Sequence, residues 1–533
     1  MRPLISRVAM VIDVGLLVVA CASATSPAPD TSPSRPPAAS SDPPAASATP
    51  SAHPLLTTPP IPTQTSSPAV GGWPYNLDDL SYPAFGPDGT VYFLTRDSRD
   101  EYQQNLVALD AAGHVKPGWP IEEPPGSDFG SLALGPDGSV YIEERGGLEV
   151  GSVVHRFDAS GQDLSGWPFE VPPSFTCPAG EPYYTDDPRT PAANDPCYPP
   201  SLDIAPNGTA YLRNHRSVGP RLIAIDPSGE IRPGWPIDLD DQDWTDQQLG
   251  SDGTVFLLRR PIGSQTWDPV RGVVDDDAEL WAFGPNGQPR PGWPVPVPNI
   301  GGFLIHPHGD VVVWSLFDDI GELCRYPRRT VYTVLASDGR TLPGWPRGST
   351  GFASFPAVGA DGTVYYVSAT DKIYAHDRAG EVKTGWPVAV PGAGSGCGPE
   401  SPYIAPDGTV YVVGDEVTAL SPDGHSPSGW PYRPPGQLVG PCLDSECFGG
   451  HGAPAFGPGG TVYLIVFHTD PAGVRAEVVA LDRQGQLKPG WPYRLPFDPA
   501  SVAVGLAMSP DGRLYVRGGD AFMALDPDGG VSD

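Results

Sequence analysis

The sequence has 533 residues, a net charge of −31 and a pI near 4.5. Its 65 Gly and 70 Pro are together a larger share of the chain than the average of roughly 12%. The 13 Trp, 20 Tyr and 17 Phe indicate packed cores. We therefore expect short strands joined by tight turns. The acidic balance argues against nucleic acid as a partner, because neutralising phosphates needs Lys and Arg. The acidity itself is typical of a soluble surface.

Residues 1–21 have the pattern of an export signal. Two arginines precede an apolar run from Val8 to Ala20 that is too short for a comfortable membrane span. The run ends in Val18-Val19-Ala20-Cys21, which resembles the bacterial lipobox, whose Cys receives a lipid. Asp13 departs from that pattern, at a cost of about 2.5–3.5 kcal/mol on insertion scales. We expect an extracytoplasmic lipoprotein held to the bacterial membrane through Cys21; the alternative is a cleaved signal peptide and secretion.

Residues 22–71 are rich in Pro, Ser, Thr and Ala and contain almost no large apolar side chains. Such a segment cannot bury enough surface to fold, so we predict a disordered stalk. It would span about 155 Å as polyproline II or roughly 40 Å as a loose coil. The folded body is expected in residues 72–533, with the lipid as its only contact with the membrane.

A compound repeat fills this body. Gly-Trp-Pro occurs nine times, with Trp73, Trp119, Trp167, Trp235, Trp293, Trp345, Trp386, Trp430 and Trp491. A second motif also occurs nine times, as PDGTVY at 87–92 and, in related forms, at 136, 206, 251, 307, 360, 406, 458 and 510. Successive copies of Gly-Trp-Pro lie 41 to 68 residues apart, which is the period of a repeat architecture.

Each copy predicts four short antiparallel strands, A to D. In the first copy these are 82–86, 90–94, 106–109 and 115–119, with Asp-Gly turns between A and B and between C and D. Four antiparallel strands at this period predict one blade of a β-propeller. We therefore predict an all-β, nine-bladed propeller, with eight blades as the alternative.

The ends of the repeat predict how the ring closes. The first Gly-Trp-Pro, at 72–74, has no A, B or C strand before it, and the last copy has no Gly-Trp-Pro after it. Residues 71–76 are therefore expected to pair with residues near 521–530 and supply the missing outer strand. This leaves no free sheet edge.

The repeats resemble the PQQ-like β-propeller family. The likeness lies in the Ala, Asp, Gly and Trp spacing, as in Ala108, Asp110, Gly113 and Trp119. It implies that each Gly-Trp-Pro indole packs between neighbouring blades. Because Trp is also the largest apolar wedge, we assign all nine a structural docking role. The family's PQQ sites use a vicinal Cys pair that this chain lacks, so the resemblance does not carry PQQ over.

Loop lengths predict which face of the ring works. The long connections, D–A and B–C, open on the same face and include 169–200, 259–278, 316–329 and 432–453. The six remaining cysteines lie in these connections, and an even number in an exported chain suggests disulfides. The pairs considered are Cys177–Cys197, Cys442–Cys447 and, by elimination, Cys324–Cys397.

The same loops hold the candidate binding residues, which are Tyr183, Tyr184, Trp244, Trp267, Asp275, Asp276 and Asp277. Aromatic and acidic side chains together suit sugars or a basic peptide. The Asp run, or DLDDQDW at 238–244, is a weak Ca²⁺ candidate because that segment lacks the central Gly of a calcium loop. Solvated loops are the alternative, and no cofactor is expected.

The favoured function is a monomeric binding or scaffold module for an envelope protein, peptide or glycan. The alternatives are a propeller enzyme and a structural spacer. The sequence has no G-x-S-x-G elbow, HExxH or P-loop. A glycan-acting hydrolase or lyase stays the first enzyme alternative, because glycoside hydrolysis needs only two well-placed carboxylates. A quinoprotein oxidoreductase is the weaker enzyme alternative, and no catalytic residue is assigned.

Overall fold

The computed structural model describes eighteen segments of the chain. These are 75–76, 83–97, 100–125, 127–146, 152–172, 201–214, 221–240, 242–261, 266–268, 272–274, 277–318, 328–349, 351–394, 399–438, 453–470, 473–496, 504–518 and 521–527. The predicted signal and stalk, and their boundaries at 21 and 71, lie outside them and stay predictions. Within these segments no helix has the length and apolar character needed to cross a bilayer.

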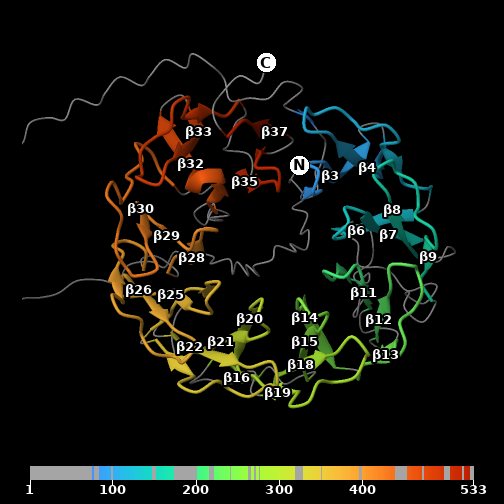
Figure 1. Cartoon of the computed structure of the whole chain (residues 1–533), viewed down its shortest axis with the longest axis horizontal. Coiled ribbons are helices and arrows are strands. Elements are labelled where there is room, and N and C mark those ends of the chain that lie inside the picture. The colour runs from blue at the N-terminus through green and yellow to red at the C-terminus, as the bar shows by residue number, and fades with distance from the viewer. Residues whose placement is uncertain are drawn as a thin grey trace, which may run out of the picture.

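The described strands form ten antiparallel sheets. Nine of them are arranged in a ring (Figure 1), and we number these as blades 1 to 9 in chain order. Blades 1 to 3 comprise β2 (Ala84–Phe85), β3 (Val91–Asp97), β4 (Asp100–Leu109) and β5 (Ile121–Glu122); β6 (Ser127–Leu134), β7 (Val140–Gly146), β8 (Val153–Phe157) and β9 (Phe169–Glu170); and β10 (Ser201–Ile204), β11 (Ala210–Arg213), β12 (Arg221–Ile225) and β13 (Ile237–Asp238). Blades 4 to 6 comprise β14 (Asp243–Leu249), β15 (Val255–Arg260), β18 (Glu279–Phe283) and β19 (Val295–Pro296); β20 (Ile300–Ile305), β21 (Val311–Asp318), β22 (Arg328–Leu335) and β23 (Arg347–Gly348); and β24 (Ala357–Val358), β25 (Val364–Ser368), β26 (Lys372–His376) and β27 (Val388–Ala389).

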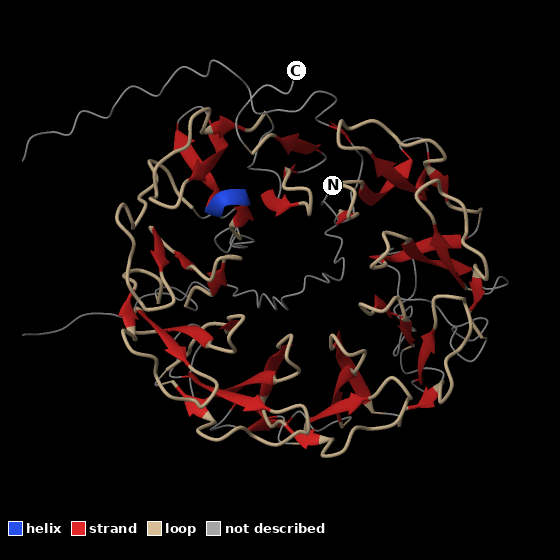
Figure 2. Cartoon of the chain, viewed as in Figure 1, coloured by secondary structure: helices blue, strands red, loops and turns tan. Residues whose placement is uncertain are grey.

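Blades 7 to 9 comprise β28 (Pro402–Ile404), β29 (Val410–Val413) and β30 (Val417–Leu420); β31 (Ala455–Gly457), β32 (Thr461–Asp470), β33 (Gly473–Leu481) and β34 (Tyr493–Arg494); and β35 (Val504–Met508), β36 (Leu514–Gly518), β37 (Ala521–Leu525) and β1 (Tyr75–Asn76). In blade 7 a single bridge between Val417 and Tyr432 stands where the other blades have a fourth strand. A separate hairpin, β16 (Thr266–Asp268) and β17 (Gly272–Val274), lies between β15 and β18. The predicted nine-bladed propeller is confirmed. Figure 2 shows a short helical turn among the described residues, η3 (Pro458–Gly460) of blade 8.

The two repeat motifs meet inside each blade. The Tyr or Phe that ends the Asp-Gly motif contacts the Gly-Trp-Pro indole of its own blade edge-on, with ring centroids 5.4 to 5.5 Å apart in seven blades. This geometry suits the aromatic quadrupoles. In blade 5 the motif ends in Val312, and Trp345 instead lies 5.9 Å from His376 of blade 6.

Each indole also reaches the next blade. Trp235 is 7% exposed and donates its Nε1–H to the carbonyl oxygen of Pro285, 3.1 Å away in blade 4. Six other repeat tryptophans make the same bond to the next blade at 3.0 to 3.2 Å. Trp491 is the exception among the described residues, because its buried indole N–H has no acceptor. Trp73 lies outside them.

The outer strand of each blade begins later than predicted. In blade 1 residues 115–119 do not form strand D; Val115 makes one bridge to Leu109, and β5 starts after Pro120. The reason is the docking turn: Gly118 has φ 90°, and a Cβ there would collide with the backbone carbonyl of Ser160 in blade 2. Trp119–Pro120 is a cis peptide bond. Because Pro precedes β5, no ladder N–H is lost.

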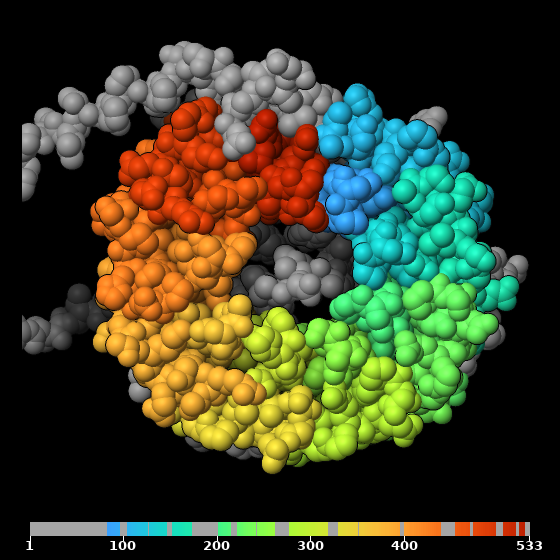
Figure 3. Space-filling view, viewed as in Figure 1, coloured from blue at the N-terminus to red at the C-terminus, as the bar shows by residue number. Residues whose placement is uncertain are grey.

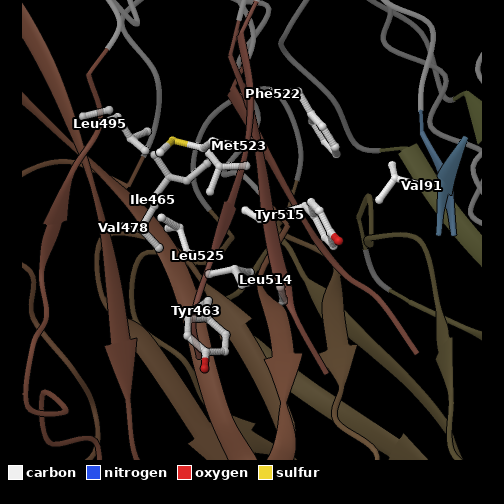
Figure 4. Packing of buried hydrophobic residues seen from close by; sticks show 14 of the residues in the cluster. Val91, Tyr463, Ile465, Val478, Leu495, Leu514, Tyr515, Phe522, Met523 and Leu525 are labelled. Atoms are coloured by element: carbon white, nitrogen blue, oxygen red, sulfur yellow. The ribbon is translucent and has the colours of Figure 1, made fainter. Parts of the chain in front are cut away.

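The ring closes as predicted. β1 pairs with β37 in the register Tyr75 with Phe522 and Asn76 with Ala521. One apolar cluster spans this closure, and Figure 4 shows it with Tyr463 and Ile465 from blade 8, Leu514 and Phe522 from blade 9, and Val91 from blade 1. Arg513 of blade 9 donates to the carbonyl oxygen of Ala111 in blade 1 at 2.6 Å. Tyr463 of blade 8 donates its hydroxyl hydrogen to the carbonyl oxygen of Pro527 in blade 9 at 3.1 Å. Blade 9 is therefore packed and hydrogen-bonded to both neighbours.

Candidate functional site

The two faces of the ring differ in how their polar groups are used. We call the face with the A–B and C–D turns the turn face, and the face with the B–C and D–A connections the loop face. On the turn face, Lys383 Nζ lies 3.0 Å from Asp361 and 3.1 Å from Thr363. These contacts join the C–D turn of blade 6 to its A–B turn. Lys116 makes the same contacts in blade 1. These basic residues stand three positions before the repeat Trp, a sequence signal that the repeat analysis missed.

Many of the predicted loop-face residues lie outside the described residues. This applies to Tyr183, Tyr184, Asp275 and Asp276, to all six cysteines considered for disulfides, and to Cys21. Their roles remain predictions. The described candidates, Trp244, Trp267 and Asp277, all belong to blade 4.

Trp244 lies in a polar network instead of presenting its ring to solvent. It is 5% exposed and donates its Nε1–H to the Asp240 carboxylate at 2.9 Å. Arg259 contacts the same carboxylate at 2.9 Å and reaches Glu279 at 3.2 Å. Trp281 donates to Glu279 at 3.1 Å and meets Trp244 edge-on at 5.6 Å. The segment that carries Asp240 is therefore tied to the blade, and its carboxylate is already engaged.

Trp267 and Asp277 lie in the B–C connection above this network. Trp267 pairs with Val273 in the β16–β17 hairpin. Asp277 is exposed just before β18. Among the described residues no group of three His, Cys, Asp or Glu side chains is placed to hold a metal ion.

The inner strands line the central opening of the ring, which the space-filling view shows (Figure 3). Three of them, β6, β14 and β20, carry a bulge. Bulges re-aim side chains and often occur beside functional sites. At the β14 bulge Gln247 donates to Asp203 of blade 3 at 2.6 Å, and Asp246, with φ 49°, lies 3.6 Å from Arg260. Polar side chains therefore gather at the β14 bulge, between blades 3 and 4.

Sequence reasoning missed the charged cluster of blade 2. Arg145 lies between Glu143, at 3.2 Å, and Asp128, at 3.6 Å. Glu143 is fully buried, and burial raises its pKa to about 7 although Arg145 acts in the opposite direction. Asp128 is half-exposed. Two carboxyls in such different surroundings resemble an acid–base pair, but Glu143 cannot touch a substrate in this conformation.

A histidine on the neighbouring strand β8 faces the other side of the same sheet. His155 Nε2 is 3.0 Å from Glu144, and its Nδ1 is 3.0 Å from Asp163. Burial lowers the pKa of His155, but the hydrogen bonds and charges of Asp163 and Glu144 outweigh it and raise that pKa overall. Both ring nitrogens are engaged, which indicates a structural role for the ring.

No protein-family model and no curated protein matches the chain. Solved structures with a similar course include the Dos1 propeller, at 10% identity over 86% of this chain and 96% of that one, with a TM-score of 0.40. BamB from Moraxella catarrhalis is 15% identical over 61% of this chain and 96% of its own, with a TM-score of 0.28. A puromycin hydrolase is 15% identical over 84% of this chain and 61% of its own, with a TM-score of 0.35. At these values the likenesses indicate neither a family nor a function.

Proposed function

We propose that this chain is a binding or scaffold protein of the bacterial envelope, tethered by a lipid on Cys21, that recruits its partner on the loop face. The observation that carries the proposal is the difference between the two faces. The described turn-face contacts recur from blade to blade, as with Lys116 and Lys383. The loop-face ends of blades 2, 3 and 4 each hold a different set of charged groups, which are Arg145 with Glu143 and Asp128, Arg221 with Asp238, and Arg259 with Asp240 and Glu279.

The predicted export signal and stalk favour a place in the bacterial envelope. The repeats resemble PQQ-like propellers, and the lack of a vicinal Cys pair favours a member of that kind without the cofactor. The partner would be an envelope protein, peptide or glycan. We expect Tyr183, Tyr184, Trp267 and the Asp275–Asp277 run to contribute to the surface. Trp244 would act from beneath it, by holding Asp240 and Arg259 in place.

Site-specific photo-crosslinking in living cells tests the proposal with the full chain. The crosslinker replaces one exposed loop-face residue at a time, Asp277 in blade 4 or Asp415 in blade 7. Matched turn-face positions are Val382 and Leu487, which are 44% and 40% exposed. We expect the same adduct from both loop-face positions and none from the turn face. Adducts confined to the turn face would overturn the assignment, and no adduct from either would favour the spacer.

The enzyme alternative is weaker, because Glu143, the buried member of the Asp128–Glu143 pair on Arg145, cannot touch a substrate in this conformation. Glycan hydrolysis by the purified chain, lost in Asp128→Asn, would support it. Dye reduction that requires added PQQ would instead support the quinoprotein alternative.

A further inference from the structure

The interior of blade 2 holds an acid with no ordinary structural role. Glu143 is 0% exposed and lies two residues after Tyr141 on β7, so both side chains point to the same face of the sheet. Tyr141 packs in a cluster with Trp167 of its own blade and with Leu202 and Leu212 of blade 3. The Glu143 carboxyl therefore lies at the interface between blades 2 and 3, toward the loop face.

Within the described part of the chain, the Glu143 carboxyl has one polar contact. Its Oε2 lies 3.2 Å from Arg145 Nε, while its Oε1 is buried and has no hydrogen-bond partner among the described residues. A buried carboxylate needs several donors to offset the loss of water. One contact from an arginine is too little, so the site is poorly suited to the ionised acid.

Arg145 links this acid to the inner strand. Its Nη1 lies 3.6 Å from Asp128 on β6, and its guanidinium rests on the backbone at Gly130, where a Cβ would collide with it. Asp128 accepts a hydrogen bond from Gln104 of blade 1 at 3.0 Å. The position of Arg145 therefore couples blades 1, 2 and the interface with blade 3.

Few charges face Glu143. Arg145 lowers the pKa of Glu143 and Asp128 raises it, but burial is the largest influence. Across the ladder it is paired with Val154 of β8, and blade 3 presents Leu202 and Leu212 to the same cluster. His155, Glu144 and Asp163 act on the opposite face of the sheet.

We propose that Glu143, Arg145 and Asp128 form a proton-operated latch at the loop-face end of blade 2. When Glu143 is protonated it stays buried, and Arg145 is free to hold Asp128 and the inner strand. When Glu143 ionises, carrying the carboxylate to water becomes favourable, and the contact between blades 2 and 3 loosens. The latch would change the shape of the proposed binding face with pH, but its motion does not depend on the presence of a ligand.

The sign of the response follows from the pKa. The pKa of Glu143 is raised from 4.5 to about 7 in the closed state of the latch. The free energy that favours this closed state is therefore fully present below pH 4.5 and decreases as the pH rises to about 7. If the open state has an ordinary glutamate, the open population grows about tenfold for each pH unit in that window and is constant above it.

Hydrogen–deuterium exchange of the full chain, read on peptides covering 127–146, tests the latch. After correction for intrinsic exchange, the opening of this segment should increase about tenfold per pH unit between roughly 5 and 7. Glu143→Gln, which keeps a neutral side chain at every pH, should remove this dependence. Glu170→Gln, at an exposed position on β9 of the same blade, is the matched control and should behave as the wild type.

Two more variants test the same pH dependence in case Glu143→Gln disturbs the packing between blades 2 and 3. Asp128→Asn removes the charge that raises the pKa of Glu143, so its exchange curve should move to lower pH. His155→Gln should leave the slope in place. Equal pH slopes in the wild type and Glu143→Gln, or opening that decreases as pH rises, would overturn the proposal. Because no ligand enters the experiment, either result leaves the proposed function to be judged separately.

Discussion

The docking of Trp235 gives the sharpest test of what holds the ring together. Its ring is buried between blades 3 and 4, meets Tyr211 edge-on at 5.5 Å, and donates to Pro285 at 3.1 Å. Trp235→Ala should cost about 3–5 kcal/mol through the cavity and the lost contacts. For a body of this size that corresponds to roughly 3–5 °C in Tm.

Substitution by Phe separates the ring from its hydrogen bond. Trp235→Phe keeps most of the apolar volume but leaves the Pro285 carbonyl without its donor, at about 1–3 kcal/mol. Trp491→Phe should cost less, because the Trp491 indole N–H has no acceptor among the described residues. Comparing the same substitution at two copies of the repeat isolates the hydrogen bond.

Thermal and urea unfolding of the purified variants provide the measurement. Ile231→Ala is the matched control, since Ile231 lies four residues earlier and is 39% exposed; it should change stability by less than about 0.5 kcal/mol. A loss below 1 kcal/mol in Trp235→Ala, or one equal to the control, would refute the docking argument.

Three more predictions concern closure, anchoring and acid stability. Deleting residues 71–78 removes β1 and should lower Tm by many degrees, whereas deleting 40–47 in the stalk should not; an unchanged melt for the first deletion would refute closure by β1. Cys21→Ala should abolish incorporation of a radiolabelled lipid precursor, and the absence of label on the wild type would refute the anchor. Burial raises the pKa of Asp361, but hydrogen bonds from Thr363 and Lys383 outweigh it and bring that pKa to about 2. Asp361 therefore stabilises the fold above pH 3.8 and loses this effect as pH falls toward 2, so the stability gap between wild type and Asp361→Asn in urea should narrow over that range, and a constant gap would contradict the argument.

The ring and its closure could be predicted because the repeat fixes both. Nine copies of two motifs set the number of blades, and the leftover Gly-Trp-Pro at the start indicated which segment completes blade 9. The position of strand D could not be read from the residues alone. It depends on contact between Gly118 and the next blade, and strand propensity in 115–119 carries no information about that neighbour.

The site was harder to predict because, in repeat copies that depart from the common pattern, the sequence does not show where each strand begins or which side chains face inward. The pattern DLDDQDW is typical of an acidic loop, yet Trp244 is the second residue of the inner strand β14 and packs inward. Glu143 was overlooked because charged residues are normally placed outside. The alternation of β7 did contain the signal, since Glu143 is two positions after the buried Tyr141.

The position of β1 in the ring determines how the propeller would be oriented if the predicted stalk attached it to a membrane. Residues 75–76 form the outermost strand of blade 9, so the stalk predicted from the sequence would join the ring at its circumference and not at the centre of either face. A propeller attached at its circumference can orient with its plane perpendicular to the membrane. Neither flat side is then pressed against the lipid surface, and a bulky partner can approach from the side.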